Sequence, residues 1–228
     1  PPEEGGGLPC GRRGARGMKI LGITGESGSG KSTIINLLMR FYDTDSGRIL
    51  IDGEDIRSIP RDELYSKFGV VFQNDFLFAD TIAENIRYFR DIPDSQLESA
   101  IKTAQAKSFT DSAGGTGYLV SARGNNLSGG QKQRLLIALA ANPEILVLDD
   151  SSSALDYRTD AVLRKELAAG YSSSTLIIIA QRISSIMGAD MIIVMEGGRM
   201  IGKGKHAELI ESCPVYREIY DVQNGREE

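Results

Sequence analysis

The 228-residue sequence is poor in the residues on which several kinds of catalytic and metal site depend. It has one histidine, His206, no tryptophan and two cysteines, Cys10 and Cys213. One histidine leaves no ligand set for a histidine-based metal cluster and argues against a Ser-His-Asp triad. We expect His206 to be structural or solvated at the start of a helix. Two cysteines far apart are too few for a disulfide framework, so we expect a reducing, cytoplasmic environment.

Long apolar runs and an excess of basic residues are also absent. The longest apolar runs, residues 145–148 and 176–180, have the length of strands, whereas a membrane-spanning helix needs about 20 apolar residues. No signal peptide is visible. The 26 Lys and Arg residues are outnumbered by 31 Asp and Glu residues, which gives a formal net charge of −5. We therefore expect no direct membrane span and no nucleic-acid partner.

Short apolar runs alternate with helical patterns from Met18 onward. This alternation predicts an α/β fold with a mostly parallel sheet. The expected strands lie at residues 19–23, 68–72, 145–148, 176–180 and 191–195. The expected helices lie at residues 31–40, 81–88, 156–169 and 183–187. Turn sequences also predict two hairpins, at 48–53 and around 196–198.

Composition divides the chain into a leader, one domain and a short tail. Residues 1–17 are rich in Gly, Pro and Arg, and we interpret them as a disordered or non-native leader. Residues 18–224 form the predicted domain, and 225–228 are the tail. A helical insertion of about 91–141, with expected helices at 94–107 and 128–141, separates the two parts of the core, 18–90 and 142–224.

The segment from Gly25 to Ser32, GESGSGKS, fits the pattern G-x-x-x-x-G-K-[ST] between an expected strand and an expected helix. Glycines in such a loop let backbone N–H groups surround phosphate oxygens at a helix N-terminus. Lys31 is then expected to contact the β- and γ-phosphates, and the Ser32 hydroxyl a Mg²⁺ ion. The expected binding residues are Gly25, Glu26, Ser27, Gly28, Ser29, Gly30, Lys31, Ser32 and Thr33. A Gly/Ser-rich turn that fits the pattern by chance is the alternative.

The apolar run 145–148 ends in two acidic residues, Asp149 and Asp150. Such a run is typical of a buried strand in a parallel sheet, and ligands bind at the carboxyl ends of these strands. We expect Asp149 to hold Mg²⁺ opposite Ser32, and Asp150 to lie next to the attacking water. Solvated acids at a strand end are the alternative.

The sequence Leu127-Ser128-Gly129-Gly130-Gln131 precedes a helical run. Ser128 and Gln131 have the spacing of a capping box. Two glycines in a first helical turn are unfavourable, which indicates that another group approaches the backbone closely. Ser128, Gly129, Gly130 and Gln131 are therefore expected to form a second anion site at a helix N-terminus. A well-capped helix without a ligand is the alternative.

In their order along the chain, these motifs resemble the nucleotide-binding domain of an ATP-binding cassette (ABC) transporter, from Met18 to about Asn224. GESGSGKS resembles Walker A, ILVLDD resembles Walker B, and LSGGQ matches the family signature. Gln73 matches the Q-loop glutamine, and residues 153–156 match the D-loop. Residues 74–78, 81–86 and 122–124 resemble the exporter branch, which moves drugs, lipids or peptides.

The resemblance implies a P-loop NTPase that binds ATP and Mg²⁺ and hydrolyses ATP to power an exporter. Two such domains pair head to tail, with each ATP between Walker A of one chain and the signature of the other. The implied metal-binding residues are Ser32, Gln73 and Asp149, and the implied catalytic residues are Lys31, Gln73, Asp150 and Gln181. The groove near Gln73 receives transmembrane partner domains, which implies a location on the cytoplasmic face of the plasma or inner membrane.

Three other classes remain as alternatives. The first is a non-catalytic regulatory ATP-binding subunit of such a transporter. The second is a soluble ABC protein of DNA repair or translation, which a single acidic cassette with an exporter-like Q-loop disfavours. The third is a small P-loop kinase, which does not account for LSGGQ or the D-loop.

Two departures from the family pattern fall in the catalytic machinery. The residue after the Walker B aspartate is usually Glu, and here it is Asp150, whose carboxylate is one methylene shorter. The switch histidine is replaced by Gln181, which can donate a hydrogen bond but cannot carry the charge. The signature, which serves the partner's site, is intact. We therefore expect slow hydrolysis at this chain's own site, as in the degenerate half of a heterodimer; a homodimer that tolerates both changes is the alternative.

Two further departures concern structure. Residues 1–24 contain no aromatic side chain, so the usual adenine platform and its antiparallel strand are expected to be missing or supplied elsewhere. The stretch between the signature and Walker B is about two residues short, which would rotate a helix face by about half a turn.

Overall fold

Six strands form the central sheet of the computed structural model, which describes residues 20–72, 76–88, 90–140, 143–150, 156–171 and 173–225. Their order across the sheet is β4-β5-β6-β1-β7-β8. The strands are β1 (Ile20–Gly25), β4 (Phe68–Val71), β5 (Ile145–Asp149), β6 (Thr175–Ile179), β7 (Met191–Glu196) and β8 (Arg199–Gly204). Adjacent strands from β4 to β7 are parallel, and only β8 pairs in antiparallel fashion. The prediction of a mostly parallel α/β fold is confirmed.

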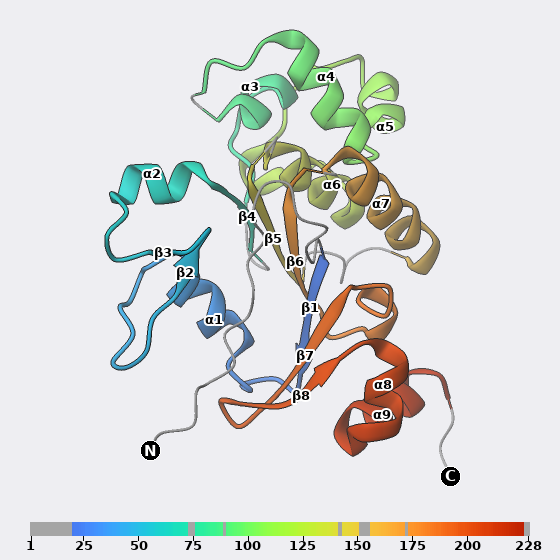
Figure 1. Ribbon diagram of the computed structural model, residues 1–228. Helices are drawn as coiled ribbons and strands as arrows, with labels where there is room; N and C mark the ends of the chain where they lie inside the picture. The colour runs from blue at the N-terminus through green and yellow to red at the C-terminus, as the bar shows by residue number, and fades with distance from the viewer. Residues whose placement is uncertain are drawn as a thin grey trace.

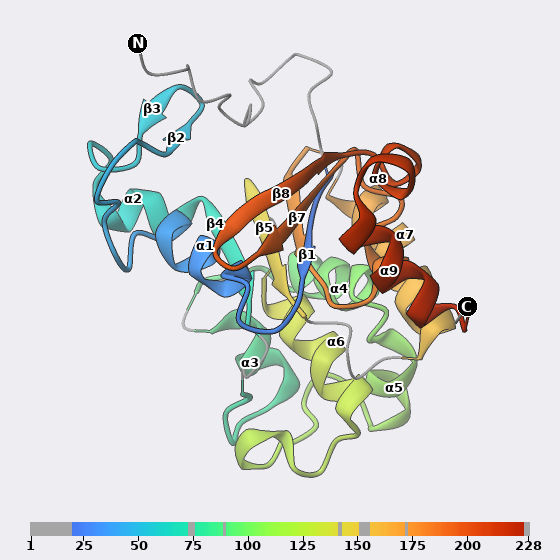
Figure 2. The same cartoon turned by 90° about the horizontal axis from the view of Figure 1, so that it is seen from below.

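Both faces of the sheet are covered at β1, β5, β6 and β7, which is why these strands are mostly apolar at successive positions, whereas the edge strand β8 is largely exposed. Side chains alternate between the two faces of a strand. Ile145 and Val147 of β5 pack into one core with Ile35 of α1 (Lys31–Leu38). Leu146 and Leu148 pack into the opposite core, which helices α6 to α9 cover. Figures 1 and 2 show α1 on one side of the sheet and α7, α8 and α9 on the other.

The remaining helices include those predicted at 81–88, 128–141 and 156–169, with shifted ends, and one at 61–66 that was not predicted. They are α2 (Arg61–Ser66), α3 (Ile82–Arg87), α4 (Asp94–Thr103), α5 (Lys107–Ser112), α6 (Gly129–Leu139), α7 (Tyr157–Gly170), α8 (His206–Ser212) and α9 (Pro214–Gln223), with 3-10 turns η1 (Ala122–Gly124) and η2 (Ile183–Ser185). The expected helix at 183–187 is thus a single 3-10 turn. None of the described helices combines the length and the apolar character needed to cross a membrane.

Helices α3 to α6 lie between β4 and β5 in the chain and gather at one end of the sheet (Figure 1). The helix expected at 94–107 is present as α4 but ends early, at Thr103, because the chain turns before α5 begins at Lys107. Gln105 adopts a left-handed φ of 54°, and the Ala106 amide donates to the Ile101 carbonyl at 2.9 Å. The domain boundaries proposed from the sequence stay a prediction, and the leader 1–17 and residues 226–228 lie outside the described residues.

Both expected hairpins are present. Strands β2 (Leu50–Ile51) and β3 (Glu54–Asp55) pair in antiparallel fashion across Asp52 and Gly53, and both turn residues have positive φ. The second hairpin joins β7 and β8 through Gly197 and Gly198. The expected loss of an N-terminal antiparallel strand concerns residues outside the described part of the chain, and the expected two-residue shortening includes residues 141–142, also outside it.

His206 is a structural residue, as expected. It begins α8, and its Nδ1 lies 2.9 Å from the hydroxyl of Tyr216, which is fully buried. Its ring also packs against the ring of Tyr220, with centroids 5.1 Å apart. The histidine therefore joins α8 to α9. The free thiol of Cys213 is buried between the same two helices.

The pKa of Asp55, on the small hairpin, is expected to lie far below that of an ordinary aspartate carboxyl group. Hydrogen bonds from the Arg57 side chain, including one of 2.7 Å from Nη2, lower the pKa of Asp55 from 3.8 to about 2. Its contribution to stability is therefore present above pH 3.8 and is lost as the pH falls through about 2. An NMR titration should give a midpoint near 2, and a midpoint that moves toward 3.8 in Arg57→Ala, where only the backbone hydrogen bond from residue 57 remains. A variant midpoint that stays near 2 would contradict this assignment.

Candidate functional site

The phosphate loop lies between β1 and α1. Strand β1 ends at Gly25, and helix α1 begins at Lys31. Gly28 (φ 79°) and Gly30 (φ 98°) turn the backbone through left-handed conformations that residues with side chains adopt only with strain. The turn aims the first turn of α1 back toward the loop, as an anion site at a helix N-terminus requires.

The side chain of Lys31 folds back into this loop. Its Nζ donates to the carbonyls of Gly25 at 2.8 Å and Glu26 at 2.5 Å, and to Ser29 Oγ at 3.3 Å. Lys31 is buried, and burial lowers the pKa of its ammonium group, while the neighbouring Asp149 and Asp150 act in the opposite direction. The cation is thus held at the centre of the loop by loop oxygens.

Strand order brings Asp149 to the same place from the other half of the chain. Asp149 ends β5, and its Oδ2 accepts a hydrogen bond of 3.2 Å from Ser32 Oγ, 117 residues away in the sequence. Burial raises the pKa of Asp149, an effect that the Ser32 hydrogen bond opposes. Two oxygen-bearing side chains from separate motifs therefore meet beside Lys31.

Asp150 and Gln181 line the same cavity of about 200 Å³. Asp150 is buried with φ of 48°, and its amide donates to the Ile179 carbonyl at 2.8 Å. This bond fixes the backbone just beyond the end of β5. Gln181 follows β6, the neighbouring strand. The complete lining is Ser27, Gly28, Gly30, Lys31, Ser32, Thr33, Asp149, Asp150, Ile179 and Gln181.

The second candidate anion site is a separate helix N-terminus. Ser128 caps α6 with the expected capping box: Gln131 N donates to Ser128 Oγ at 3.3 Å, and Ser128 N donates to Gln131 Oε1 at 2.9 Å. Residues 128–131 do not contribute to the lining of the cavity around Lys31. The two predicted anion sites of this chain are therefore distinct in space.

Gln73 and most of the D-loop, 151–155, lie outside the described residues. Asp156, the last D-loop residue, caps α7: its carboxylate accepts from Thr159 N at 2.9 Å and from Thr159 Oγ1 at 2.7 Å. The Thr159 hydrogen bonds also lower the pKa of Asp156. In this structure, the described side chain at the end of the D-loop is a helix cap.

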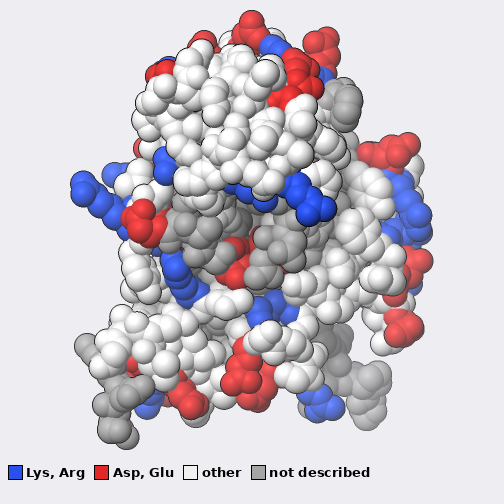
Figure 3. Space-filling model, turned by 180° about the vertical axis from the view of Figure 1, so that it is seen from behind, with Lys and Arg blue, Asp and Glu red and all other residues white. Residues whose placement is uncertain are grey.

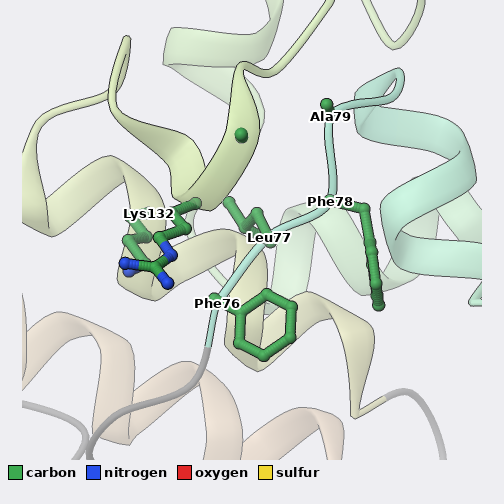
Figure 4. Close-up of a pocket in the computed structure, with 7 residues that line it drawn as sticks. Phe76, Leu77, Phe78, Ala79 and Lys132 are labelled. Carbon is green, nitrogen blue, oxygen red and sulfur yellow. The ribbon is translucent and has the colours of Figure 1, made fainter.

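A groove of about 470 Å³ begins just after Gln73. Its lining is Phe76, Leu77, Phe78, Ala79, Ala122, Arg123 and Lys132. Figure 4 shows Phe76 and Phe78 on one segment without regular secondary structure and Lys132 across from them. Phe76 and Phe78 are exposed and stack edge to face, with ring centroids 5.4 Å apart. The groove thus has an apolar wall and a basic wall.

Asn85 of α3 fixes the apolar wall of this groove. Its Oδ1 accepts from Phe78 N at 2.8 Å, and its Nδ2 donates to the carbonyls of Phe78, Asp80 and Thr81. Asn85 is buried, so these bonds are sheltered from water.

Figure 3 shows basic side chains along the lower edge of the part formed by helices α3 to α6, on the face opposite to that of Figure 1.

Strand, loop and helix together define a P-loop nucleotide-binding domain. A family model described as "ABC transporter" matches residues 15–153. The chain therefore belongs to the ABC transporter family and is an ATP-binding domain of this family, of the ATPase class. The resemblance expected from the motifs is confirmed.

Individual relatives agree with this assignment. The chain is 42% identical over 207 residues to an uncharacterized ABC transporter ATP-binding protein of Bacillus subtilis, YfiC, covering 89% of this chain and 34% of YfiC. It is 43% identical over 215 residues to a second such protein of B. subtilis, YknU, covering 92% of this chain and 36% of YknU. The chain thus spans about a third of the length of these relatives.

A solved structure shows the same fold. It is described as a bacterial Atm1-family ABC exporter with ATP bound, and it matches with a TM-score of 0.85 and 42% sequence identity. The match covers 90% of this chain and 37% of the exporter chain. The predicted fold of an ATP-binding domain of this family is confirmed.

Proposed function

We propose that this chain binds Mg-ATP in the cavity around Lys31 and hydrolyses it to drive an exporter. The observation that carries the proposal is the meeting of Lys31, Ser32 and Asp149 in one cavity that Asp150 and Gln181 also line. A buried cation beside a helix N-terminus favours the β- and γ-phosphates of a nucleotide. The buried acids across from it favour a metal ion and an attacking water.

The donor atoms suit Mg²⁺. This ion prefers oxygen ligands, keeps several waters, and binds through one or two carboxylates together with substrate phosphates. Ser32 Oγ and Asp149 Oδ2, 3.2 Å apart, provide such oxygens, with Gln73 as the proposed third residue. Among the described residues, no group of three His, Cys, Asp or Glu side chains could hold a metal alone. The metal is therefore expected to bind together with the nucleotide.

Each residue of the cavity has a proposed role in hydrolysis. Lys31 and the loop amides stabilise the charge on the phosphates. Asp150, held by its backbone bond to Ile179, orients the attacking water, and Gln181 donates a hydrogen bond to the γ-phosphate. Gln73 completes the proposed catalytic set.

The second anion site supports a dimer as the active form. Residues 128–131 lie outside the cavity of their own chain, so they are available to a nucleotide held by another chain. We propose a head-to-tail pair in which ATP is held between the two chains, with a heterodimer as the preferred pairing. The groove lined by Phe76, Phe78 and Arg123 is the proposed contact for transmembrane domains, which would place the chain at the cytoplasmic face of the membrane.

Titration with Mg-ATP tests the binding step. Isothermal titration of the full chain should give saturable binding that ADP displaces competitively. A folded chain, checked by circular dichroism, that binds no Mg-ATP would overturn the proposal. Saturable binding would also show that the site forms without an aromatic residue in positions 1–24.

Restoring the usual catalytic pair is expected to raise turnover. The double variant Asp150→Glu with Gln181→His lengthens the carboxylate and supplies an ionisable imidazole. A misplacement of about 1 Å can lower a rate about 100-fold, so we expect the variant to hydrolyse ATP at least about 10-fold faster in the assembled transporter. Steady-state phosphate release measures this effect. An unchanged rate would contradict the proposed slow site, and Asp62→Glu, an exposed position on α2 outside the cavity, serves as the matched control.

A further inference from the structure

Gln223, at the end of the last helix, holds the backbone on which Gln181 lies. Its Nε2 donates to the Gln181 carbonyl at 2.7 Å, and its Oε1 accepts from the Ile183 amide at 2.8 Å. One carboxamide therefore pairs with a carbonyl and with the N–H two residues later. A neighbouring β-strand pairs with an extended backbone in the same manner.

This contact begins where the sheet ends. Strand β6 stops at Ile179, and the amide of Ala180 still donates to Ile23 of β1 at 3.1 Å. Beyond that point the sheet no longer holds the chain, although Gln181 faces the phosphate cavity. Gln223 thus supplies two hydrogen bonds at the first residues that the sheet does not support.

Helix α7 holds the same segment from its other side. Ser185 Oγ donates to Asp160 Oδ2 at 3.0 Å, and Arg164, paired with Asp160, donates to the Ser184 carbonyl. The Arg182 guanidinium lies 5.0 Å from the ring centroid of Tyr157. Both α7 and α9 contact η2, and Figure 2 shows these helices on the same side of the sheet. Helices α7 and α9 thus both contact the segment that follows β6, and Gln223 makes the hydrogen bonds from α9.

We propose that Gln223 is a positioning residue, which holds the backbone at Gln181 so that this side chain can reach the γ-phosphate of bound nucleotide. This inference rests on the proposed function, because it assumes that Gln181 contacts that phosphate. Gln223 itself does not line the cavity and acts only through the backbone of residues 181–183. Loss of its two bonds frees the segment at the point where Gln181 leaves the sheet.

The first test measures discrimination between nucleotides with and without a γ-phosphate. Dissociation constants for Mg-AMP-PNP and Mg-ADP are measured on the full chain, and their ratio is compared between variants. The near-isosteric Gln223→Met removes both hydrogen bonds and should reduce the preference for Mg-AMP-PNP about 5-fold, as the loss of one hydrogen bond predicts. Val222→Ala, at an exposed neighbouring position on α9, should leave the ratio unchanged.

A second measurement shows whether the effect passes through Gln181. In a Gln181→Ala background, Gln223→Met should change the ratio no further, whereas a purely structural residue would add its own effect. Amide hydrogen exchange reports on the contact directly. The Ile183 amide should exchange at least about 10-fold faster in Gln223→Met. Gln223→Glu, which keeps the acceptor, should leave that amide protected and provides a second variant if Gln223→Met does not fold.

The outcomes separate this inference from the function on which it rests. If the wild-type chain binds neither nucleotide, the proposed function fails and the positioning role fails with it. If the wild type binds both and Gln223→Met leaves the ratio unchanged, only the positioning role is overturned. An equal loss of affinity for both nucleotides would also overturn it, because that result indicates a general structural effect.

Discussion

Replacing Lys31 with alanine is expected to weaken Mg-ATP binding by at least about 100-fold. The Lys31 ammonium group is buried among the oxygens of Gly25, Glu26 and Ser29, and it is the cation nearest to the proposed phosphates within the cavity lining that the structure describes. Charge-assisted hydrogen bonds contribute about 1.5–3 kcal/mol each. The loss of contacts to two phosphates therefore amounts to about 3 kcal/mol or more, which is roughly 100-fold in affinity.

Isothermal titration of the variant and the wild type provides the measurement. Lys165→Ala is the matched control, because Lys165 is an exposed lysine on α7 and does not line the cavity. The control should bind Mg-ATP as the wild type does. Affinity within about 3-fold of wild type in folded Lys31→Ala, a difference of less than 1 kcal/mol, would show that the nucleotide binds elsewhere.

Replacing Gly25 with alanine is expected to destabilise the fold by about 4 kcal/mol. A Cβ at this position would lie 2.1 Å from the carbonyl oxygen of Met195 and 2.8 Å from Ser29 Oγ. The Met195 oxygen belongs to β7, which pairs with β1 at this register, so it cannot move without disrupting the sheet. Overpacking costs about 1–3 kcal/mol, and the φ of 146° adds about 1–3 kcal/mol of backbone strain.

Gly28→Ala separates the steric effect from the conformational one. Gly28 also has a positive φ, 79°, but an added Cβ would meet no atom within 4 Å. We expect this variant to lose only about 1–2 kcal/mol, the cost of a left-handed conformation for an alanine. Urea unfolding followed by circular dichroism measures both variants. Equal losses in the two would refute the proposed clash with Met195.

Much of the fold and of the candidate site could be predicted because the signals are local. GESGSGKS is eight consecutive residues, and the φ values of its glycines depend on the loop itself. The run 145–148 predicted a buried strand because a sheet covered on both faces needs apolar side chains at every position. Ser128 and Gln131 are three residues apart, so their capping box could be anticipated from spacing alone.

Local signals were insufficient where a short turn decides the structure. The periodicity of 94–107 is that of one helix, yet α4 ends at Thr103, the chain turns at the left-handed residue Gln105, and a separate helix, α5, begins at Lys107. Neither the capping motifs nor the hydrophobic spacing distinguishes a continuous helix from two helices that share an apolar face. The burial of Ala104 and Ala106 on either side of the turn stabilises the break through tertiary packing.

The sequence by itself determined the phosphate loop, the acidic end of β5, the signature helix and the family, because each of them depends on short runs of consecutive residues. Only the tertiary structure decided which distant groups meet. The order of the strands brings Asp149 to Ser32 across 117 residues, and the packing of α9 brings Gln223 to the backbone of Gln181 across 42. No local pattern encodes the second contact, because a glutamine near the end of an amphipathic helix acquires this partner only when the helix packs against the segment that follows β6.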